Sequence, residues 1–418
     1  MIFILIYIIF LSSWNQIIRS TIKILIFISN IKMSIWLLLK LIFLFLYVGL
    51  SALITFLIYR EETPFYTPIY VKKKSEKEGE KETTVNLHDE FDVYAKRDEP
   101  INVIKLFIGM LTIFWPKFIL AVLLSYGFSV NCYNISKKKN FKLSKEDIDL
   151  IINRTKFWTK IFVKVCGGFV DFKRLPEEKV LPVYKKYFGP DYKIDYDGKF
   201  SCYISNHTCM YDMALAMSFM GTGFVAKEAV KKVPIFGKMN IGLHSILVDR
   251  SSTGAKKDVL ELIEERQKDH MEGKPVMPFT IFPEGTTSSG RHILKFKKGA
   301  FNSLLPVKAT FIHPNLNKKY HLGCGSTDVG MNFLRSLAEL YFKLEYIELP
   351  IMTPNEYMYK NFSHFGKEKW EIYAEVAREI MCELGDFKKS DFGLKDSYRY
   401  CSCIDKKALL DRDTYKIE

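Results

Sequence analysis

The chain begins with long apolar runs and changes, after about residue 130, to a region where short apolar and polar stretches alternate. Residues 34–59 form one of these runs, and Lys40 is the one basic or acidic side chain within it. A helix rises 1.5 Å per residue, so a helix over this run is longer than the roughly 30 Å hydrocarbon core of a bilayer. We therefore predict a transmembrane helix at residues 34–59.

Two other apolar runs do not predict a simple membrane span. Residues 2–29 are broken by polar side chains into halves that are each too short to cross a bilayer, and Met33 is an alternative translation start. Residues 101–130 carry Pro116 and Lys117 at their middle, and both residues oppose a straight span. A kinked or re-entrant hairpin fits this run as well as a full crossing does.

Two more polar segments follow the first runs. Residues 71–100 mix lysine and glutamate with few apolar side chains, which predicts a solvated, disordered linker. Ser144 to Asp147 resembles a capping box and predicts a helix that runs toward Val165. On that helix Phe157 and Trp158 interleave with lysines, a pattern that suits a membrane surface. A helix packed against the protein core fits the same pattern equally well.

Residues 184–385 show the alternation of strand and helix patterns that is typical of an α/β domain. The candidate strands are short apolar stretches bounded by polar or turn residues, at 200–204, 223–226, 245–248, 277–282, 310–312 and 344–351. Helical patterns cover 213–220, 253–271, 329–342 and 370–384. We predict an α/β fold with a mixed β-sheet covered by helices, preceded by N-terminal transmembrane and membrane-associated helices.

These patterns divide the chain into five parts. They are an N-terminal membrane anchor at 1–60, a charged linker at 61–100, a second membrane-embedded segment with the interfacial helix at 101–170, a globular domain at 171–385 and a polar tail at 386–418. The formal net charge of +14 favours acidic partners such as phosphorylated metabolites or anionic lipids. Without an arginine-rich groove segment or zinc spacing, nucleic acid is not among the partners that we expect. The eight cysteines form no Cys-x-x-Cys pair, so we predict mostly buried, reduced thiols.

A histidine and an aspartate stand where a predicted strand gives way to a predicted helix. Five residues separate His207 from Asp212, about 500° of a regular helix, so the pair would not share one helix face. They meet if His207 precedes the helix and Asp212 reaches back to one ring nitrogen. That contact would fix the tautomer and make the other nitrogen a better general base. Taken alone, a surface histidine beside a helix-start aspartate explains the pair at least as well.

A polar loop follows another predicted strand. Glu284, Gly285 and Thr286 offer a carboxylate, a hydroxyl and main-chain N–H groups at the carboxyl end of that strand, where open α/β sheets bind ligands. Arg250 comes directly after the strand at 245–248. A basic run then follows the loop, although a solvated helix face would also explain it. Its members are Arg291, Lys295, Lys297 and Lys298.

Three short motifs, in this order and spacing, resemble those of the glycerolipid (lysophospholipid) acyltransferase family. They are Asn206-His207-x4-Asp212, Val248-Asp249-Arg250 and Phe282-Pro283-Glu284-Gly285-Thr286. The resemblance covers roughly residues 150–385, and the run 296–301 strengthens it. The stretches 344–350 and 373–378 look like the branch of lysophosphatidylcholine and lysophosphatidylethanolamine acyltransferases. Pro306-Val307-Lys308-Ala309 departs from the Pro-Val-like pair that many members carry at this position.

The resemblance implies a membrane-bound enzyme of phospholipid synthesis or remodelling, integral to the endoplasmic reticulum. Such an enzyme transfers a fatty acyl group from acyl-CoA to the free hydroxyl of a lysophospholipid, with His207 as the base and Asp212 as its orienting partner. The implied substrate-binding residues are Arg250, Glu284, Gly285, Thr286, Lys297 and Lys298. Arg250 would pair with the acceptor's phosphate, and the two lysines with CoA phosphates or the membrane surface. The expected partners are acyl-CoA, a lysophospholipid and the lipid bilayer, with no metal and no cofactor besides the co-substrate acyl-CoA.

Several alternatives remain open from the sequence. The same motifs serve enzymes that acylate lysophosphatidic acid or glycerol 3-phosphate, and an inactive membrane-anchored lipid-binding relative would also carry the fold. Cys209 is a candidate nucleophile for an acyl-enzyme, although a helix start would point it away from His207. Asn206 begins one of four Asn-x-Ser/Thr patterns, and a glycan there would block the site, which favours a cytosolic face. The sequence does not give the oligomeric state.

Overall fold

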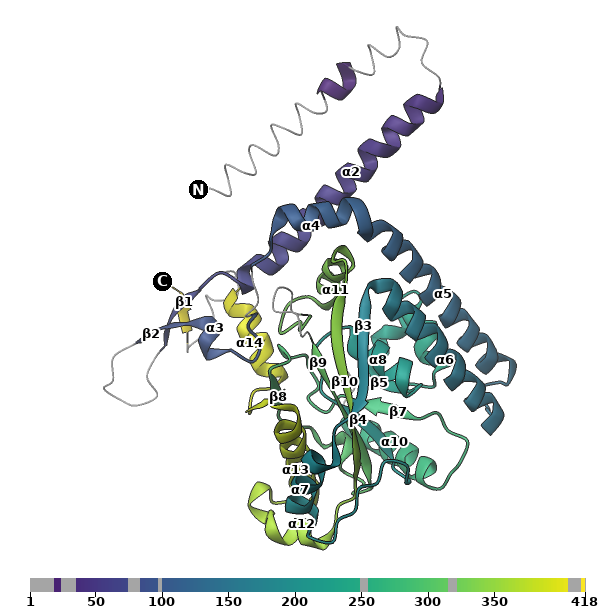
Figure 1. Ribbon diagram of the computed structural model, residues 1–418, viewed down its shortest axis with the longest axis vertical. Coiled ribbons are helices and arrows are strands. Elements are labelled where there is room, and N and C mark those ends of the chain that lie inside the picture. The colour runs from purple at the N-terminus through teal and green to yellow at the C-terminus, as the bar shows by residue number, and fades with distance from the viewer. Residues whose placement is uncertain are drawn as a thin grey trace. The chain divides into compact units, whose positions relative to one another are not determined.

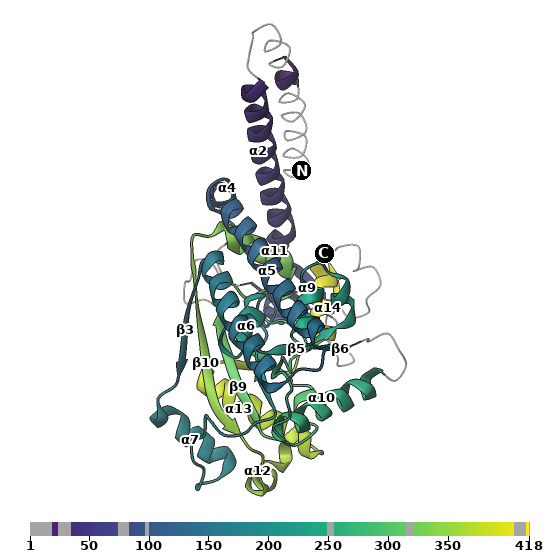
Figure 2. The ribbon, with the colours of Figure 1, turned by 90° about the vertical axis from the view of Figure 1, so that its right-hand side faces the viewer.

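The computed structural model describes residues 19–23, 35–73, 83–96, 100–248, 255–314, 322–404 and 415–417 (Figures 1 and 2). The chain divides into two compact units, residues 1–54 and residues 55–418. The finer division into five parts stays a prediction from the sequence.

The predicted N-terminal helix is present as α2 (Ile35–Glu62). Within the described residues, Trp36–Phe65 and Val103–Lys138 are the two helical segments that are long and apolar enough to cross a membrane, judged by length and composition. The large exposed side chains of α2 include Trp36, Phe43 and Leu46, which fits a helix that is solvated by lipid rather than by water.

The second apolar run is one helical segment, so the expectation of a re-entrant hairpin is wrong. It consists of α4 (Val103–Gly109), five residues of π-helix (η2, Met110–Phe114) and α5 (Trp115–Lys138). Pro116 lies just after the π-helical residues, where the segment changes direction (Figure 1). A proline and a π-bulge are both established causes of such bends, so the kinked alternative describes this helix.

Lys117 lies in this apolar helix without exposing its charge to hydrocarbon. Its ammonium donates to the carbonyls of Cys166 (3.2 Å), Glu339 (2.6 Å) and Leu340 (3.0 Å). Cys166 ends one helix, and the other two carbonyls directly follow a second. Carbonyls at helix ends lack intrahelical partners and carry partial negative charge, so a cation there satisfies both helices.

Helix α6 (Lys145–Cys166) begins with the predicted capping box, because the Ser144 and Asp147 side chains each accept the other's main-chain N–H. One face of α6 is buried, including Ile151 and Val163. The core-packed alternative therefore holds for this face, while Phe157 on another face keeps 59% of its surface exposed.

A seven-stranded mixed sheet forms the centre of the second unit, in the order β3-β10-β9-β4-β7-β5-β6. β9 and β10 are antiparallel, and the other neighbours are parallel. The strands are β3 (Gly168–Arg174), β4 (Cys202–Ser205), β5 (Gly223–Lys227), β6 (Ile246–Val248), β7 (Phe279–Ile281), β9 (Val307–Pro314) and β10 (Phe342–Met352). All six strands predicted from the sequence are confirmed, and β3 was missed.

Helices cover both faces of this sheet, as the fold class predicted (Figures 1 and 2). The α-helices described between residues 177 and 385 are α7 (Glu177–Phe188), α8 (Tyr211–Phe219), α9 (Phe236–Gly242), α10 (Ala255–Met271), α11 (Val329–Ala338), α12 (Glu356–Asn361) and α13 (Lys369–Gly385). Successive residues of a strand face opposite sides. In β10, Ile347 packs in a core with α7 and α13, while Tyr346 contacts Phe219 of α8 on the other face. Helix α11 ends four residues before the predicted helix, because β10 begins at Phe342.

The departure at residues 306–309 lies at the start of β9, where the register with β10 shifts between the pairs Thr310–Glu348 and Lys308–Ile351. Lys308 is buried in this strand, and its ammonium lies 2.7 Å from the carboxylate of Glu348 on β10. A buried charge needs such a partner, so the lysine is accommodated by its pair in the neighbouring strand.

The predicted charged linker and polar tail are partly folded. The described parts contain β1 (Tyr70–Lys73), β2 (Thr83–Asn86), α3 (Leu87–Glu90), β11 (Lys388–Ser390), α14 (Leu394–Ile404) and β12 (Tyr415–Ile417). β11 pairs with β8 (His292–Leu294). Leu87, Phe91 and Tyr94 form a small core with Tyr400 and Cys403 of α14. The expectation of a solvated linker is therefore wrong for residues 83–96, whose apolar side chains find their partners about 300 residues later in the chain.

Candidate active site

His207 and Asp212 meet in the loop that joins β4 to α8. The strand ends at Ser205, and Asp212 is the second residue of the helix. His207 Nδ1 lies 2.9 Å from Asp212 Oδ2. The predicted contact between a histidine ahead of the helix and an aspartate in its first turn is thus confirmed. With Nδ1 engaged, Nε2 is the ring nitrogen that is left for chemistry, and the His207 side chain is 23% exposed.

The Asp212 carboxylate is fully buried and firmly held. It accepts hydrogen bonds from the main-chain N–H groups of Thr208 and Cys209 (2.9 Å for Cys209), from Thr208 Oγ1 (2.9 Å) and from Cys209 Sγ (3.2 Å). A buried carboxylate held by this many donors cannot rotate freely. It therefore fixes both the tautomer and the orientation of His207.

The ring of His207 is also held by stacking. Phe282, the residue that follows β7, lies with its ring centroid 4.4 Å from that of His207 and an interplanar angle of 20°. Phe282 stacks in turn on Phe224 of β5 (6.0 Å). Sequence reasoning placed Phe282 in a motif but did not predict this contact, because the pairing of two strands brings the rings together.

Glu284 occupies a different place from the one predicted for a substrate-binding residue. Its side chain is fully buried, Oε1 accepts the N–H of His207 (2.7 Å), and Oε2 accepts the N–H of Leu294 (2.8 Å). Both carboxylate oxygens are thus used to hold main chain, including the main chain of His207 itself. In this structure Glu284 positions the site from inside and does not face a substrate.

The environment of Glu284 makes folding stability depend on pH. Burial raises the pKa of Glu284 to about 8, against the two main-chain hydrogen bonds that lower it. The folded state therefore binds the proton more tightly than the unfolded state, whose carboxyl pKa is near 4.5. The contribution of this group to stability is fully present below that value and is lost as pH rises toward 8, by on the order of a few kcal/mol.

We expect this loss to appear in the difference between wild type and Glu284→Gln. Four buried or half-buried histidines have pKa values lowered by desolvation and act in the opposite sense, so the pH dependence of wild-type stability combines both effects. They are His244, His270, His292 and His313. Chemical denaturation of both proteins between pH 4.5 and 8 measures the difference. A difference in unfolding free energy that does not change with pH would contradict the prediction.

The remaining predicted site residues are only partly brought together. Gly285 has φ of +69°, and a Cβ there would collide with the ammonium of Lys297, so the backbone and this lysine are in close contact. Thr286 is half-buried next to them. Lys298 points elsewhere, with Nζ 5.7 Å from the ring centroid of Trp370 on α13. Arg250 lies outside the described residues.

Comparison with known proteins agrees with these motifs. The acyltransferase family model matches residues 197–314, which include His207, Asp212 and Glu284. This chain contains an acyltransferase-family domain. It is 28% identical over 217 residues to the lysophospholipid acyltransferase LPEAT1 of Arabidopsis thaliana, covering 51% of this chain and 52% of that protein. It is 24% identical over 195 residues to lysophosphatidylcholine acyltransferase 1 of Homo sapiens (46% and 34%), and 33% identical over 113 residues to the 1-acyl-sn-glycerol-3-phosphate acyltransferase of Escherichia coli (26% and 44%).

The matches cover only part of these relatives, since the chain spans about half of the plant protein's length and less of the human and bacterial ones. Among solved structures, the 1-acyl-sn-glycerophosphate acyltransferase of Thermotoga maritima is similar at 16% identity and a TM-score of 0.39, covering 65% of this chain and 97% of that one.

Other parts of the chain complete the acyltransferase domain in ways that the sequence did not indicate. The main-chain N–H of Ser288 donates to the His207 carbonyl (2.9 Å), and that of Ser289 donates to the Val93 carbonyl (2.8 Å). The polar loop is thus held between the histidine and the segment predicted to be a linker. Val93 and Ser289 are far apart in sequence and interact through their main chains, so no pattern of side chains in the sequence predicts this contact.

Asn206 is unavailable for glycosylation in the folded acyltransferase domain. Its side chain is fully buried and pairs with the main chain of Ile312 in β9, through Nδ2 (3.0 Å) and Oδ1 (2.8 Å). The Asn-x-Thr pattern therefore reflects the attachment of the His207 loop to the sheet.

An apolar cavity of about 450 Å³ adjoins the loop that carries His207. Met210 of this loop is part of its wall, and most of the wall comes from α5, α6, α8, α9 and α11. The lining is almost entirely aliphatic, aromatic or methionine, and it includes Phe118, Ala121, Phe128, Trp158, Phe162, Met217, Ile235, Met239 and Phe333. Such a predominantly apolar cavity suits a hydrocarbon chain better than a polar ligand.

Proposed function

We propose that this protein transfers a fatty acyl group from acyl-CoA to the free hydroxyl of a lysophospholipid of the lysophosphatidylcholine or lysophosphatidylethanolamine type. The observation that carries the proposal is the His207–Asp212 pair in an acyltransferase-family domain, with Nδ1 bound to a buried carboxylate. The plant and human relatives, named for lysophospholipid and lysophosphatidylcholine acyl transfer, support the acceptor class.

The chemistry follows from the geometry of His207. An alcohol is a weak nucleophile at neutral pH, so Nε2 takes its proton as the oxygen attacks the thioester carbonyl. The new C–O bond replaces the C–S bond when the tetrahedral intermediate collapses. The imidazolium then returns the proton to the departing CoA sulfur, and Asp212 stabilises the imidazolium in the meantime.

Direct transfer is favoured over an acyl-enzyme. Cys209 is fully buried, and its Sγ donates to Asp212 (3.2 Å). Burial and the nearby carboxylate raise the pKa of the Cys209 thiol well above its usual value. The thiolate is the nucleophilic form, so this cysteine is poorly suited to attack a thioester.

We assign the binding groups by charge and position. Gly285, Thr286 and the ammonium of Lys297 lie together at the loop that follows β7, and we propose that they and Arg250 contact the phosphates and glycerol of the two substrates. Lys298 is assigned to CoA or to the membrane surface. The apolar cavity beside Met210 would hold the fatty acyl chain.

We further propose that α2 and the α4–α5 segment hold the protein in a bilayer, as an integral protein of the endoplasmic reticulum. Their length and composition support this. Lysophospholipids and long-chain acyl-CoA partition into membranes, so an enzyme embedded there meets both substrates.

The test uses membranes that have been washed with carbonate, because a protein anchored by these helices stays with them. The membranes receive labelled acyl-CoA and, separately, lysophosphatidylcholine, lysophosphatidylethanolamine, lysophosphatidic acid and glycerol 3-phosphate. We expect acylation of the first two. Exclusive use of the last two would establish the second candidate function, which the match to the bacterial 1-acyl-sn-glycerol-3-phosphate acyltransferase supports. If no acceptor is acylated, the remaining candidate is an inactive, lipid-binding relative.

The acyl-chain assignment predicts a change in chain-length preference when the cavity is filled. Ala121 on α5 lines the cavity and is nearly fully buried. If Ala121→Phe excludes about two methylenes at about 0.8 kcal/mol each, kcat/KM for long acyl-CoA should fall roughly tenfold relative to short acyl-CoA. Leu120→Phe is the matched control, since Leu120 neighbours Ala121 but is 49% exposed and outside the lining. Equal chain-length profiles for the two variants would place the acyl chain elsewhere.

A further inference from the structure

The stretch 373–378 was singled out by sequence, but the proposed chemistry does not use it. It lies in α13, and its last residue, Arg378, is buried with only 1% of its side chain exposed. An arginine is seldom buried this completely unless its donors are satisfied. The partners of Arg378 therefore indicate what it does.

The guanidinium of Arg378 bridges the two strands β8 and β11. It donates to the carbonyl of Ile293 in β8 through Nε (3.3 Å) and Nη2 (3.0 Å), and to the carbonyl of Ser390 in β11 through Nη2 (2.5 Å). Nη1 pairs with Glu375 on the preceding turn of α13 (3.2 Å). Arginine's planar fork suits such fixed, multiple contacts.

The carbonyl of Ile293 belongs to the same peptide group as the N–H of Leu294. That N–H donates to Glu284 Oε2 (2.8 Å), and Glu284 Oε1 accepts the N–H of His207 (2.7 Å). A peptide group is planar and rigid, so fixing its oxygen also fixes the direction of its N–H. Arg378 on one side and Glu284 on the other thus hold one rigid unit between them.

We propose that Arg378 is a positioning residue for the acyl transfer reaction, acting through the Ile293–Leu294 peptide and Glu284 on the main chain of His207. This inference rests on the proposed function. Hydrogen bonds in series polarise one another, so the Arg378 contact also strengthens the bond that Glu284 receives. The competing explanation is that Arg378 only fastens α13 to the two-stranded sheet.

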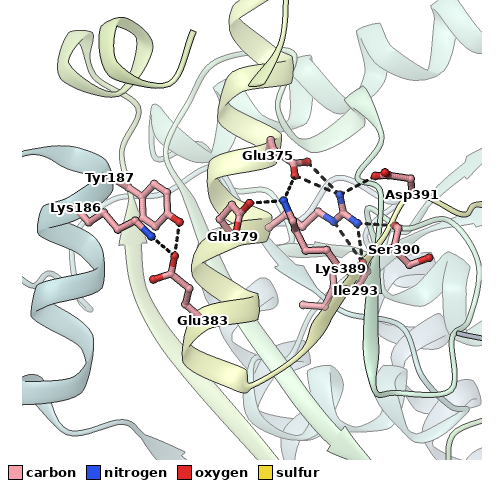
Figure 3. A network of polar contacts seen from close by, with 10 residues as sticks. Lys186, Tyr187, Ile293, Glu375, Glu379, Glu383, Lys389, Ser390 and Asp391 are labelled. Atoms are coloured by element: carbon pink, nitrogen blue, oxygen red, sulfur yellow. Dashed lines mark hydrogen bonds and ion pairs between the residues drawn. The ribbon is translucent and has the colours of Figure 1, made fainter. Parts of the chain in front are cut away.

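The two explanations differ in what a variant changes. Arg378→Gln removes the charge and the fork, and Arg378→Lys keeps the charge. Lys389→Gln is the matched control. Lys389 belongs to the same group of contacts and its ammonium pairs with Glu375 (3.1 Å) and with Glu379, whereas the Ile293 carbonyl accepts from Arg378 (Figure 3). Steady-state kinetics, thermal unfolding and hydrogen exchange of the His207 and Leu294 amides are measured for each.

We expect Arg378→Gln to lower kcat about tenfold or more, since charge-assisted hydrogen bonds are lost, while KM for both substrates changes less than about threefold. Arg378→Lys should recover part of this loss. The His207 and Leu294 amides should exchange faster in Arg378→Gln and at the wild-type rate in Lys389→Gln. In a Glu284→Gln background, Arg378→Gln should lower kcat much less than it does in the wild type. Both residues act through the same series of hydrogen bonds.

Several outcomes would overturn the inference. They are a wild-type kcat in both Arg378 variants, the same loss in Lys389→Gln, full additivity with Glu284→Gln, or unchanged amide exchange. If Arg378→Gln does not fold, Arg378→Lys decides by the same criteria. A wild-type protein that acylates no acceptor would refute the proposed function, and amide exchange would still decide whether Arg378 holds the His207 main chain.

Discussion

Replacement of His207 by alanine is expected to lower kcat by about 10²- to 10⁴-fold, the usual contribution of general base catalysis. The imidazole is the one group in the described site that combines a committed Nδ1 with a partly exposed ring, so no neighbour can take over its role. KM for both substrates should change little, because the ring acts on the hydroxyl proton and not on the bound phosphates. Purified protein or washed membranes with matched protein levels provide the measurement.

Cys209→Ala is the companion variant. The thiol shares Asp212 with His207, so its loss removes one donor from the carboxylate and leaves the main-chain N–H donors in place. We expect activity within about tenfold of wild type, the size of one such hydrogen bond. A folded but inactive Cys209→Ala, together with an active His207→Ala, would reverse the assignment and establish an acyl-enzyme.

Asp212→Asn is the second substitution with a large expected effect. Every contact of this carboxylate is a donor, so the amide group of asparagine would face the N–H of Thr208, the N–H of Cys209 or Nδ1 of His207. The imidazole would lose its tautomer and orientation together. We expect kcat to fall about 10²-fold or more, with a loss of stability of about 1–3 kcal/mol from the unsatisfied buried group.

A double variant separates this effect from general damage. If His207 and Asp212 act as one unit, His207→Ala with Asp212→Asn should be no less active than His207→Ala alone. Multiplication of the two single losses would show that Asp212 contributes to activity by another route. Near-normal turnover of Asp212→Asn would mean that the buried carboxylate does not orient the base.

The central sheet could be predicted because its strands leave a local signal. β4, β5, β7 and β9 are buried, so each is a short apolar run with polar residues after it. β3 was not predicted because it is an edge strand that carries polar residues, with Asp171 exposed and Lys173 partly exposed. His207 and Asp212 could be predicted as a pair for the same reason, since a strand end and a helix start place them five residues apart.

The role of Glu284 could not be predicted, because a carboxylate in a polar loop looks the same whether it faces a substrate or the main chain. The position of β8 determines the role of Glu284, because it brings the Leu294 N–H to this carboxylate. That position is a property of the tertiary fold. The segment 83–96 escaped prediction for a similar reason. Its apolar side chains are few, and they are buried by residues distant in sequence, including Leu294 and α14 near the other end of the chain.

The lysine in the apolar helix α5 has a consequence for how the protein is made. Lys117 donates to carbonyls that lie 49 and 222 residues further along the chain. During synthesis the helix therefore emerges long before its second partner exists, and a lysine without partners is costly in hydrocarbon. A chain that inserts this helix must leave it near the membrane surface, with the ammonium in water, until β10 and α11 are in place. In the bilayer-embedded protein proposed above, the depth of the α4–α5 segment would then be set last, when the folded domain has formed.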